Sequence, residues 1–261
     1  MMPSIDKRQV ERQFSRAANT YDEAACVQHL MSDRLLQLAC THFSETTPRI
    51  LDLGCGTGYS MGQLQKKFPQ SNITGVDLSH NMLARARNRL PAATFIQADM
   101  EHLQFQSTFK FDLVFSNASI QWCDLSSVLH TAKKMLSPGG LFVYSSFGPE
   151  THLEIARAWD IAHPGRIHHI DFLTESDHLN ALDQAGFDIL DQYRKLIQPR
   201  FDSARSMLSS VKRTGATNAS NRRDKGLLSR KTYARFLKYL GQSEPLELSY
   251  ETLSFVARIP D

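Results

Sequence analysis

The chain has 261 residues, a length that suits one α/β domain with an insertion or a small cap. Apolar residues make up 41% of it and charged residues 22%, which excludes wholesale disorder, and no apolar run approaches the ~18 residues of a membrane-spanning helix. The charged amino terminus lacks the apolar segment of a secretory signal. Four scattered cysteines without a C-x-x-C pair indicate a reducing compartment, the cytoplasm, and argue against disulfides or a cysteine-rich zinc site.

The net charge of +3 is unevenly distributed along the chain. Residues 200–240 hold eleven Lys or Arg and two acids, whereas the flanking segments are slightly acidic. This basic stretch is expected either to meet an anionic partner, such as nucleic acid, an acidic protein or an acidic substrate, or to form a solvated helical face.

Elements follow one another in a regular order along the chain. Apolar spacings of three and four predict a helix over residues 5–40. Strand-like runs are expected at 50–53, 72–77, 94–98, 111–116, 141–147, 187–197 and 246–259. Helical patterns are expected at 60–68, 79–89 (with Ser79 as cap), 125–136, 174–185, 203–211 and 229–240. This alternation predicts an α/β fold with a doubly wound, mostly parallel seven-stranded sheet. The last two strands lack a plain crossover helix between them, which predicts an antiparallel last strand.

The strongest local signal is a glycine-rich turn between a strand and a helix, residues 52–58, with the pattern D-x-G-x-G-x-G. Glycine permits unusual backbone angles and lets a ligand approach the main chain. The spacing does not meet the dinucleotide fingerprint G-x-G-x-x-G, and the Gly-Lys-Ser/Thr of a P-loop is absent.

Three acids accompany this turn. Asp77 ends the second strand, where a carboxylate can accept hydrogen bonds from two ribose hydroxyls. Asp99 ends the third strand, in reach of an adenine amino group, and Asp52 is placed to fix the loop or to contact an ammonium group. Such an array suits a cationic nucleoside without phosphates better than a pyrophosphate.

With these residues the chain resembles the class I S-adenosylmethionine-dependent methyltransferases, over roughly residues 48–147. The resemblance implies a Rossmann-like methyltransferase sheet, S-adenosyl-L-methionine as cofactor, S-adenosyl-L-homocysteine as product, and no metal. It also implies cofactor contacts from Asp52, Gly54, Cys55, Gly56, Thr57, Gly58, Asp77, Leu78, Met82, Asp99, Met100 and Asn117. The chain is then expected to comprise an N-terminal helical lid (1–47), the cofactor-binding core (48–199), a basic helical insert (200–240) and the last strand of the core (241–261).

Two other local patterns suggest different chemistry. Residues 58–62 satisfy G-x-S-x-G, the nucleophile elbow of α/β-hydrolases, but the preceding strand ends too early to run into its first glycine. His163, His168 and His169 suggest a metal site, but no H-E-x-x-H pattern is present, and a loop role is favoured.

Four segments indicate which group of methyltransferases the chain resembles most. Ser116-Asn117 followed by Gln121-Trp122, F-x-R-A-A-x-x-Y at 14–21, K-x-x-G-A at 212–216 and G-L-x-x-R at 226–230 resemble the malonyl-acyl-carrier-protein O-methyltransferases of biotin synthesis. That resemblance implies transfer of methyl to the free carboxylate of a malonyl thioester. Because such a carboxylate is ionised at neutral pH, no general base is needed. The residues expected to orient the acceptor or receive its carrier are Tyr21 first, then Arg16, Gln121, Trp122, Lys212, Arg213, Arg222 and Arg223.

Alternatives remain open at this point. The acceptor is carried by acyl carrier protein or by coenzyme A, or it is another small carboxylate, a quinone-type molecule or RNA. RNA is disfavoured because the basic stretch matches no RNA-binding module, and no membrane partner is expected. A non-catalytic binding protein is disfavoured by the intact glycine loop with all three acids.

Overall fold

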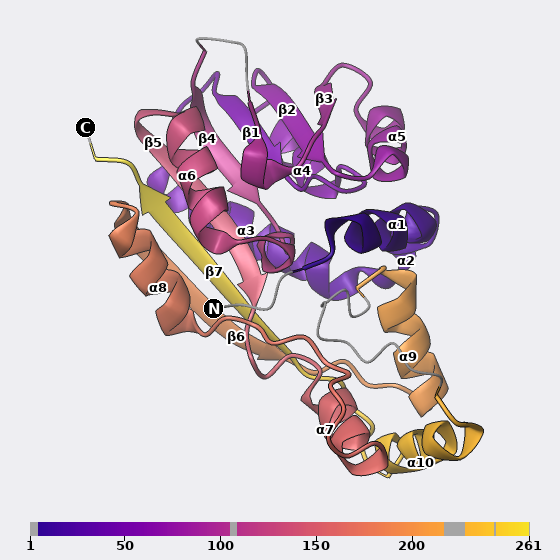
Figure 1. Ribbon diagram of the computed structural model, residues 1–261. Coiled ribbons are helices and arrows are strands. Elements are labelled where there is room, and N and C mark those ends of the chain that lie inside the picture. Colours follow the sequence, from indigo (N-terminus) through magenta and orange to yellow (C-terminus); the bar gives the residue numbers. More distant parts are fainter. Residues whose placement is uncertain (1–4, 105–108, 217–227, 243, 261) are drawn as a thin grey trace.

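The structure, a computed structural model, describes residues 5–104, 109–216, 228–242 and 244–260. A seven-stranded sheet runs through this part of the chain in the order β3-β2-β1-β4-β5-β7-β6 (Figure 1). The strands are β1 (Arg49–Leu53), β2 (Asn72–Asp77), β3 (Thr94–Gln97), β4 (Phe111–Ser116), β5 (Leu136–Phe147), β6 (Asp188–Ile197) and β7 (Tyr250–Arg258). The neighbours among β1 to β5 pair in parallel, and β7 is antiparallel to both β5 and β6. The doubly wound sheet and its antiparallel last strand are thus confirmed.

Helices cover both faces of the sheet. Their bounds are α1 (Lys7–Ala17), α2 (Tyr21–Ala24), α3 (Cys26–His42), α4 (Tyr59–Lys67), α5 (His80–Arg89), α6 (Leu125–Met135), α7 (Leu153–Ala162), α8 (Glu175–Gln184), α9 (Ala204–Arg213) and α10 (Arg230–Leu240), with short 3-10 turns η1 (Met100–His102) and η2 (Ile120–Trp122). Leu35, Leu64 and Leu83 bring α3, α4 and α5 onto one face. Val128 and Leu182 bring α6 and α8 onto the other. The core therefore lies in two layers, one on each side of the sheet.

The single helix expected over residues 5–40 is wrong, because the segment forms three helices, α1, α2 and α3. The first break lies at Thr20, whose hydroxyl donates to the carbonyl oxygens of Ala17 (3.2 Å) and Arg213 (3.0 Å). Such side-chain bonds to the backbone compete with the helical pattern. The break turns α1 toward the carboxyl ends of the strands, where the site lies.

Two further differences concern the second half of the chain. β5 begins at Leu136, directly after α6, so the expected loop before a strand at residue 141 is absent there. The register of β5 against β4 shifts between Phe111 and Leu113, as in a β-bulge, which absorbs the Ser-Pro-Gly-Gly segment. Helix α7 was not predicted.

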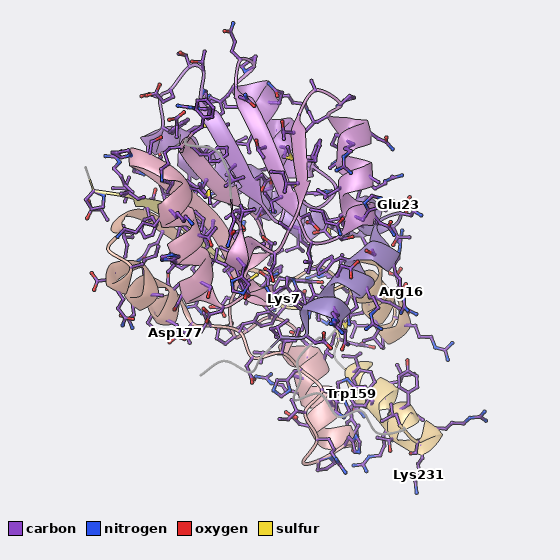
Figure 2. All side chains as sticks on the ribbon, turned by 45° about the horizontal axis from the view of Figure 1, so that its top comes forward. Lys7, Arg16, Glu23, Trp159, Asp177 and Lys231 are labelled. Atoms are coloured by element: carbon purple, nitrogen blue, oxygen red, sulfur yellow. The ribbon has the colours of Figure 1, made fainter. Side chains whose placement is uncertain are left out.

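Helices α7, α9 and α10 gather beyond one end of β6 and β7 (Figure 1). Trp159 of α7 stacks on Phe236 of α10 with ring centroids 3.9 Å apart, and Met207 of α9 is buried in the same apolar cluster. Figure 2 shows Trp159 and Lys231 in this group, away from most of the sheet. The two helices expected in the basic stretch are therefore present, although its middle lies outside the described residues. No helix within the described ranges is long and apolar enough to cross a membrane.

Candidate active site

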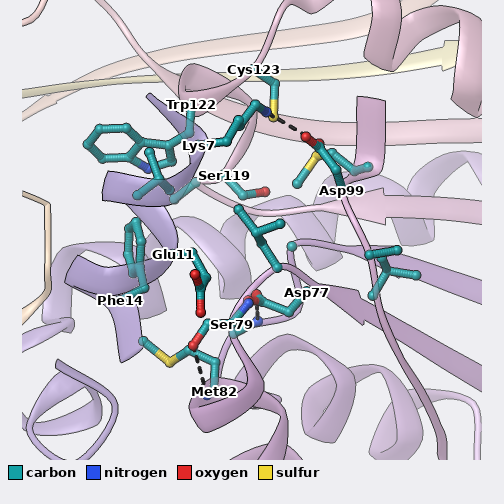
Figure 3. A pocket seen from close by; sticks show the side chains of 18 of the residues that line it. Lys7, Glu11, Phe14, Asp77, Ser79, Met82, Asp99, Ser119, Trp122 and Cys123 are labelled. Atoms are coloured by element: carbon teal, nitrogen blue, oxygen red, sulfur yellow. Dashed lines mark hydrogen bonds and ion pairs between the residues drawn. The ribbon is translucent and has the colours of Figure 1, made fainter. Parts of the chain in front are cut away.

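A cavity of about 680 Å³ lies where the parallel strands β1, β2 and β4 end and α1 crosses above them (Figure 3). The carboxyl edge of the strands is where open α/β sheets bind ligands. Eight of the twelve predicted cofactor residues line it: Gly54, Gly56, Asp77, Leu78, Met82, Asp99, Met100 and Asn117. Tyr21 and Trp122, which were expected to serve the acceptor, line it as well.

The glycine turn is held tightly against the next strand. The amide groups of Gly54 and Cys55 both donate to the carbonyl oxygen of Val76, at 2.8 and 2.9 Å. Gly54 has a φ of +74°, and a Cβ atom there would lie 2.5 Å from the Cβ atom of Ser119. A side chain at residue 54 would therefore collide with the opposite wall of the cavity.

Asp77 is the best-anchored acid of the cavity. Its Oδ2 accepts from the amide of Gly56 at 2.9 Å, and its Oδ1 accepts from the amide of Ser79 at 2.8 Å. Burial raises the pKa of this carboxyl to about 6, although these backbone hydrogen bonds act in the opposite direction. The group is ionised at neutral pH, and each oxygen keeps a lone pair for a further donor.

Asp52 lies deeper than predicted. It is 1% exposed, does not line the cavity, and neither carboxylate oxygen has a hydrogen-bond partner in the described part of the chain. Burial, together with the nearby Asp77, raises its pKa to about 8. A bound cation or hydrogen-bond donors would reduce the repulsion between these two carboxyl groups. The pair therefore suits a nucleoside that carries a sulfonium and an ammonium group.

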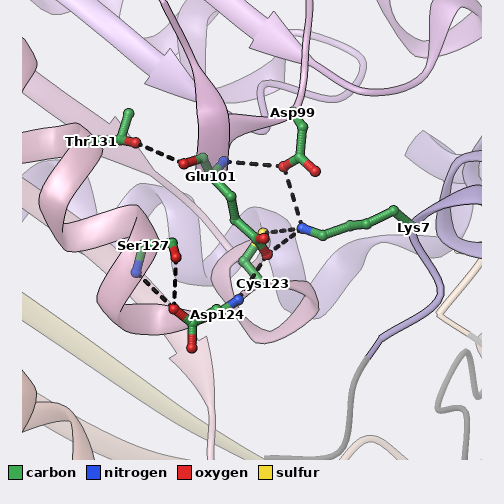
Figure 4. A network of polar contacts seen from close by, with 7 residues as sticks. All are labelled: Lys7, Asp99, Glu101, Cys123, Asp124, Ser127 and Thr131. Carbon is green, nitrogen blue, oxygen red and sulfur yellow. Dashed lines mark hydrogen bonds and ion pairs between the residues drawn. The ribbon is translucent and has the colours of Figure 1, made fainter.

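The third acid, Asp99, is held by a lysine from α1 (Figure 4). The ammonium of Lys7 lies 3.3 Å from Oδ1 of Asp99, 2.5 Å from Oε1 of Glu101 and 3.1 Å from Sγ of Cys123. Burial opposes the charge on Lys7, but Cys123, Glu101 and Asp99 outweigh this effect and raise its pKa. These three side chains are of metal-ligand type, and the lysine ammonium lies among them where a cation would bind.

The sequence predicted a helical lid over residues 1–47, but it did not indicate which residues of α1 would line this cavity. Lys7, Glu11 and Phe14 all line it, and Figure 3 shows the Glu11 carboxylate pointing toward Ser79. The ring of Phe14 meets the ring of Trp122 edge-on, with centroids 5.7 Å apart. The spacings of four and three between the three α1 residues place them on one helical face. That periodicity was visible in the sequence, but nothing local indicated that the face would meet a ligand.

Besides Asp52, three predicted cofactor contacts in the glycine motif do not line the cavity: Cys55, Thr57 and Gly58. The Thr57 hydroxyl donates to Asp22 Oδ1 at 2.6 Å, and Arg89 donates to Asp22 Oδ2 at 2.6 Å, which ties α2 to the glycine turn and to α5. Cys55 is buried in the core, and Gly58 with φ +79° begins α4. In the structure these residues shape the turn.

A second cavity of about 990 Å³ shares Trp122 with the first. Its wall is largely aromatic and aliphatic, and it includes Gln121, His152 and Lys212. The Gln121 amide donates to the carbonyl oxygen of Ala118 at 2.7 Å. Trp122 is therefore a wall residue that the two cavities have in common.

Other predicted acceptor residues are not part of either cavity. Arg16 is exposed on α1 (Figure 2), and Arg213 is ion-paired with Glu23. Arg16 and Arg213 therefore line neither cavity, and a role for them in receiving the carrier stays a prediction. Arg222 and Arg223 lie outside the described residues.

Comparisons with known proteins agree with this architecture. Residues 50–140 match a family model described as a methyltransferase domain. Malonyl-acyl-carrier protein O-methyltransferase 2 from Ilyobacter polytropus is 34% identical over 219 residues, which cover 82% of this chain and 83% of that protein. The chain belongs to the malonyl-acyl-carrier protein O-methyltransferase family. Another member, from Halorhodospira halophila, is 34% identical over 239 residues, covering 89% of this chain and 79% of its own.

Solved structures of other proteins share the fold of this chain. The [4+2]-cyclase SpnF has a TM-score of 0.65 at 18% identity and covers 99% of this chain and 98% of its own. The N-methyltransferase NodS from Bradyrhizobium japonicum, solved with S-adenosyl-L-homocysteine, has a TM-score of 0.50 at 16% identity, with 88% and 86% covered. At these identities the likeness concerns the fold alone, and it confirms the predicted Rossmann-like sheet. Together with the family match it identifies an S-adenosylmethionine-dependent methyltransferase.

Proposed function

We propose that this protein transfers a methyl group from S-adenosyl-L-methionine to the free carboxylate of a malonyl thioester carried by acyl carrier protein. The observation that carries the proposal is the pair of cavities that share Trp122 in their walls, one with the glycine turn and Asp77, the other with a largely apolar wall. The names of relatives at 34% identity support malonyl-acyl carrier protein as the acceptor.

The first cavity is assigned to the cofactor, which supplies a methyl group on a sulfonium sulfur when bound. The carboxylate of Asp77 accepts hydrogen bonds from the ribose hydroxyls, since its two oxygens are already oriented by backbone amides. Gly54 and Gly56 allow the ligand to approach the main chain. Asp52 supports the turn from beneath, and Asp99, held by Lys7, is assigned to the adenine.

The transfer itself requires alignment rather than a base. A carboxylate oxygen forms the new bond to the methyl carbon, the carbon–sulfur bond breaks, and its electron pair stays on sulfur. Opposite charges are neutralised, so dry apolar walls favour the step, and alignment at about 3–3.5 Å supplies much of the rate. The Trp122 indole N–H and the Tyr21 phenol are neutral donors that orient the carboxylate without binding its lone pairs as tightly as a cation would.

The basic stretch is assigned to the carrier. Within its described part α9 and α10 present Arg205, Lys212, Arg213, Arg230, Lys231, Arg235 and Lys238. An acidic carrier protein is attracted to such a surface before its thioester enters the second cavity, whose wall includes Lys212.

Replacing Tyr21 by Phe is expected to lower kcat/KM for methyl transfer by roughly 10- to 150-fold, as for a lost hydrogen bond to a charged group. Burial, with Asp77 and Asp22 nearby, raises the pKa of Tyr21, so the phenol stays a neutral donor. Cofactor affinity, measured by calorimetry, should change little. The exposed Tyr233, replaced in the same way, is the control. If Tyr21→Phe transfers methyl at the wild-type rate, the tyrosine is an aromatic wall residue only.

Reversing Arg222 and Arg223 to Glu is expected to raise KM for malonyl-acyl carrier protein several-fold and KM for malonyl-coenzyme A less, because coenzyme A lacks the acidic helix of a carrier. The wild-type rate on carrier protein should fall as salt is added, since exposed charges are screened within about 8–10 Å at 0.1–0.15 M. Reversal of the exposed pair Lys66 and Lys67 at the end of α4 is the control. Equal losses on both substrates would assign the arginines to the pantetheine arm or to folding instead.

The proposed function is tested by offering malonyl-acyl carrier protein, malonyl-coenzyme A and tRNA to the same enzyme with labelled methyl donor. Label should appear on the malonyl substrates. Labelled tRNA with unlabelled malonyl substrates would establish the RNA alternative.

A further inference from the structure

Several residues that line the second cavity carry a buried side-chain polar atom that has no hydrogen-bond partner among the residues described, and three of these atoms matter here. They are Oε1 of Gln121, Nε1 of Trp122 and Nε2 of His152. Buried polar groups in folded proteins are almost always paired, so these side chains are candidates for hydrogen bonds to a polar ligand in the cavity that they line. Gln121 and Trp122 belong to the segment after β4, whereas His152 comes from a different loop.

We propose that His152 determines specificity for a malonyl thioester, its Nε2–H donating a hydrogen bond to the thioester carbonyl oxygen while the carboxylate lies at Trp122. This inference rests on the function proposed above. It assigns the recognition of the second carbonyl of the acceptor, the group that distinguishes a malonyl thioester from a simple carboxylic acid.

The position of His152 suits a contact with the acceptor group next to the reacting carboxylate, the thioester carbonyl. It follows β5, and its neighbour η2 follows β4, so both lie at the carboxyl edge of two adjacent parallel strands. Trp122 lines both cavities, but His152 lines only the second. In a malonyl thioester a single methylene separates the carboxylate from the carbonyl. A donor in the wall of the second cavity, which also contains Trp122, is suited to bind the carbonyl while Trp122 binds the carboxylate.

His152 is also held firmly in place. Its amide donates to the carbonyl oxygen of Ser249 at 2.7 Å, and its own carbonyl accepts from Ala156 at 3.0 Å as α7 begins. Its ring meets the ring of Tyr250 edge-on, with centroids 4.7 Å apart at 82°. The backbone has a φ of 60°, a conformation that residues with side chains rarely adopt and that is often found at functional sites.

The charge state of this ring suits a neutral acceptor atom. Burial lowers the pKa of His152 to about 4, so the imidazole is neutral at neutral pH, with one N–H to donate. A neutral donor matches a carbonyl oxygen. A cationic residue there would instead compete for the carboxylate and draw it away from the methyl group.

The test compares two small acceptors: the malonyl thioester of N-acetylcysteamine, and its thioether analogue in which a methylene replaces the thioester carbonyl. Four enzymes are used: wild type, His152→Asn, His152→Gln and His178→Asn. Asn tolerates the left-handed backbone but cannot reach the Nε2 position, whereas Gln places an amide N–H near it. His178 is the matched control, because it is a buried histidine with an unpartnered Nε2 within the described chain but lies outside the second cavity.

The wild type is expected to prefer the thioester, and His152→Asn to lose roughly 5- to 100-fold of that preference in kcat/KM. His152→Gln should keep most of it, and His178→Asn should keep all of it, with S-adenosyl-L-homocysteine affinity unchanged in every variant. The inference would be overturned if His152→Asn kept the wild-type preference for the thioester over the thioether. It would also be overturned if His178→Asn lost as much of that preference as His152→Asn. A wild-type enzyme that methylates neither these acceptors nor malonyl-acyl carrier protein would overturn the proposed function instead.

Discussion

Replacing Asp77 by Ala is expected to weaken S-adenosyl-L-homocysteine binding by about 1.5–3 kcal/mol for each ribose hydrogen bond lost. In dissociation constant this is roughly 10- to 150-fold per bond. The variant also deprives the amides of Gly56 and Ser79 of their shared acceptor, so the glycine turn loses its support. Calorimetry on the folded variant measures the effect.

Asp112→Ala is the matched control for this variant. Asp112 also accepts a hydrogen bond from a backbone amide, that of Arg49 at 2.9 Å, but it lies at the start of β4 and lines neither cavity.

Cofactor affinity is also expected to depend on pH through the Asp77 carboxylate. Its pKa is raised to about 6, and ribose donors favour the ionised form, so wild-type affinity should be full above this pH and fall below it. Unchanged affinity in folded Asp77→Ala would remove Asp77 from the site.

Gly54→Ala is expected to abolish measurable cofactor binding. A Cβ atom at residue 54 would lie 2.5 Å from Cβ of Ser119 and 2.9 Å from the terminal methyl of Met100, so it would both displace the turn and fill the cavity. The positive φ adds backbone strain of about 1–2 kcal/mol. Urea unfolding and calorimetry together separate lost stability from lost binding.

Gly165→Ala isolates the strain. Gly165 has nearly the same φ, +75°, but a Cβ atom there meets nothing within 4 Å in the described chain. This variant should lose about 1–2 kcal/mol of unfolding free energy and bind cofactor normally. If Gly54→Ala resembled it in both measurements, the turn would not approach the ligand closely.

The central sheet was predictable because its signals are local. The bounds of β2 and β4 match the expected ranges, 72–77 and 111–116, since each strand is a short apolar run between polar residues. Ser79 caps α5 as predicted, its hydroxyl accepting from the amide of Met82 at 3.2 Å. The glycine motif and the acids after β2 and β3 converge because parallel strands end at one edge.

The rest depends on contacts between distant parts of the chain. The break after α1 involves a bond from Thr20 to Arg213, which no local pattern reveals. Likewise, Lys7 owes its place to Asp99, Glu101 and Cys123, about a hundred residues further along the chain. His152 carried no sequence signal, because its left-handed backbone and its contacts with Ser249 and Tyr250 depend on how β7 and α7 pack around it.

The chemical form of the transferred methyl group tests the central claim most directly. Malonyl-acyl carrier protein is incubated with the enzyme and S-adenosyl-L-methionine labelled in the methyl group, and the isolated carrier is treated with mild alkali. A methyl ester is hydrolysed under these conditions, so the account predicts label on the carrier that is released as volatile methanol. Label that resists alkali, or no label on the carrier under conditions where the enzyme binds its cofactor, would contradict carboxylate methylation.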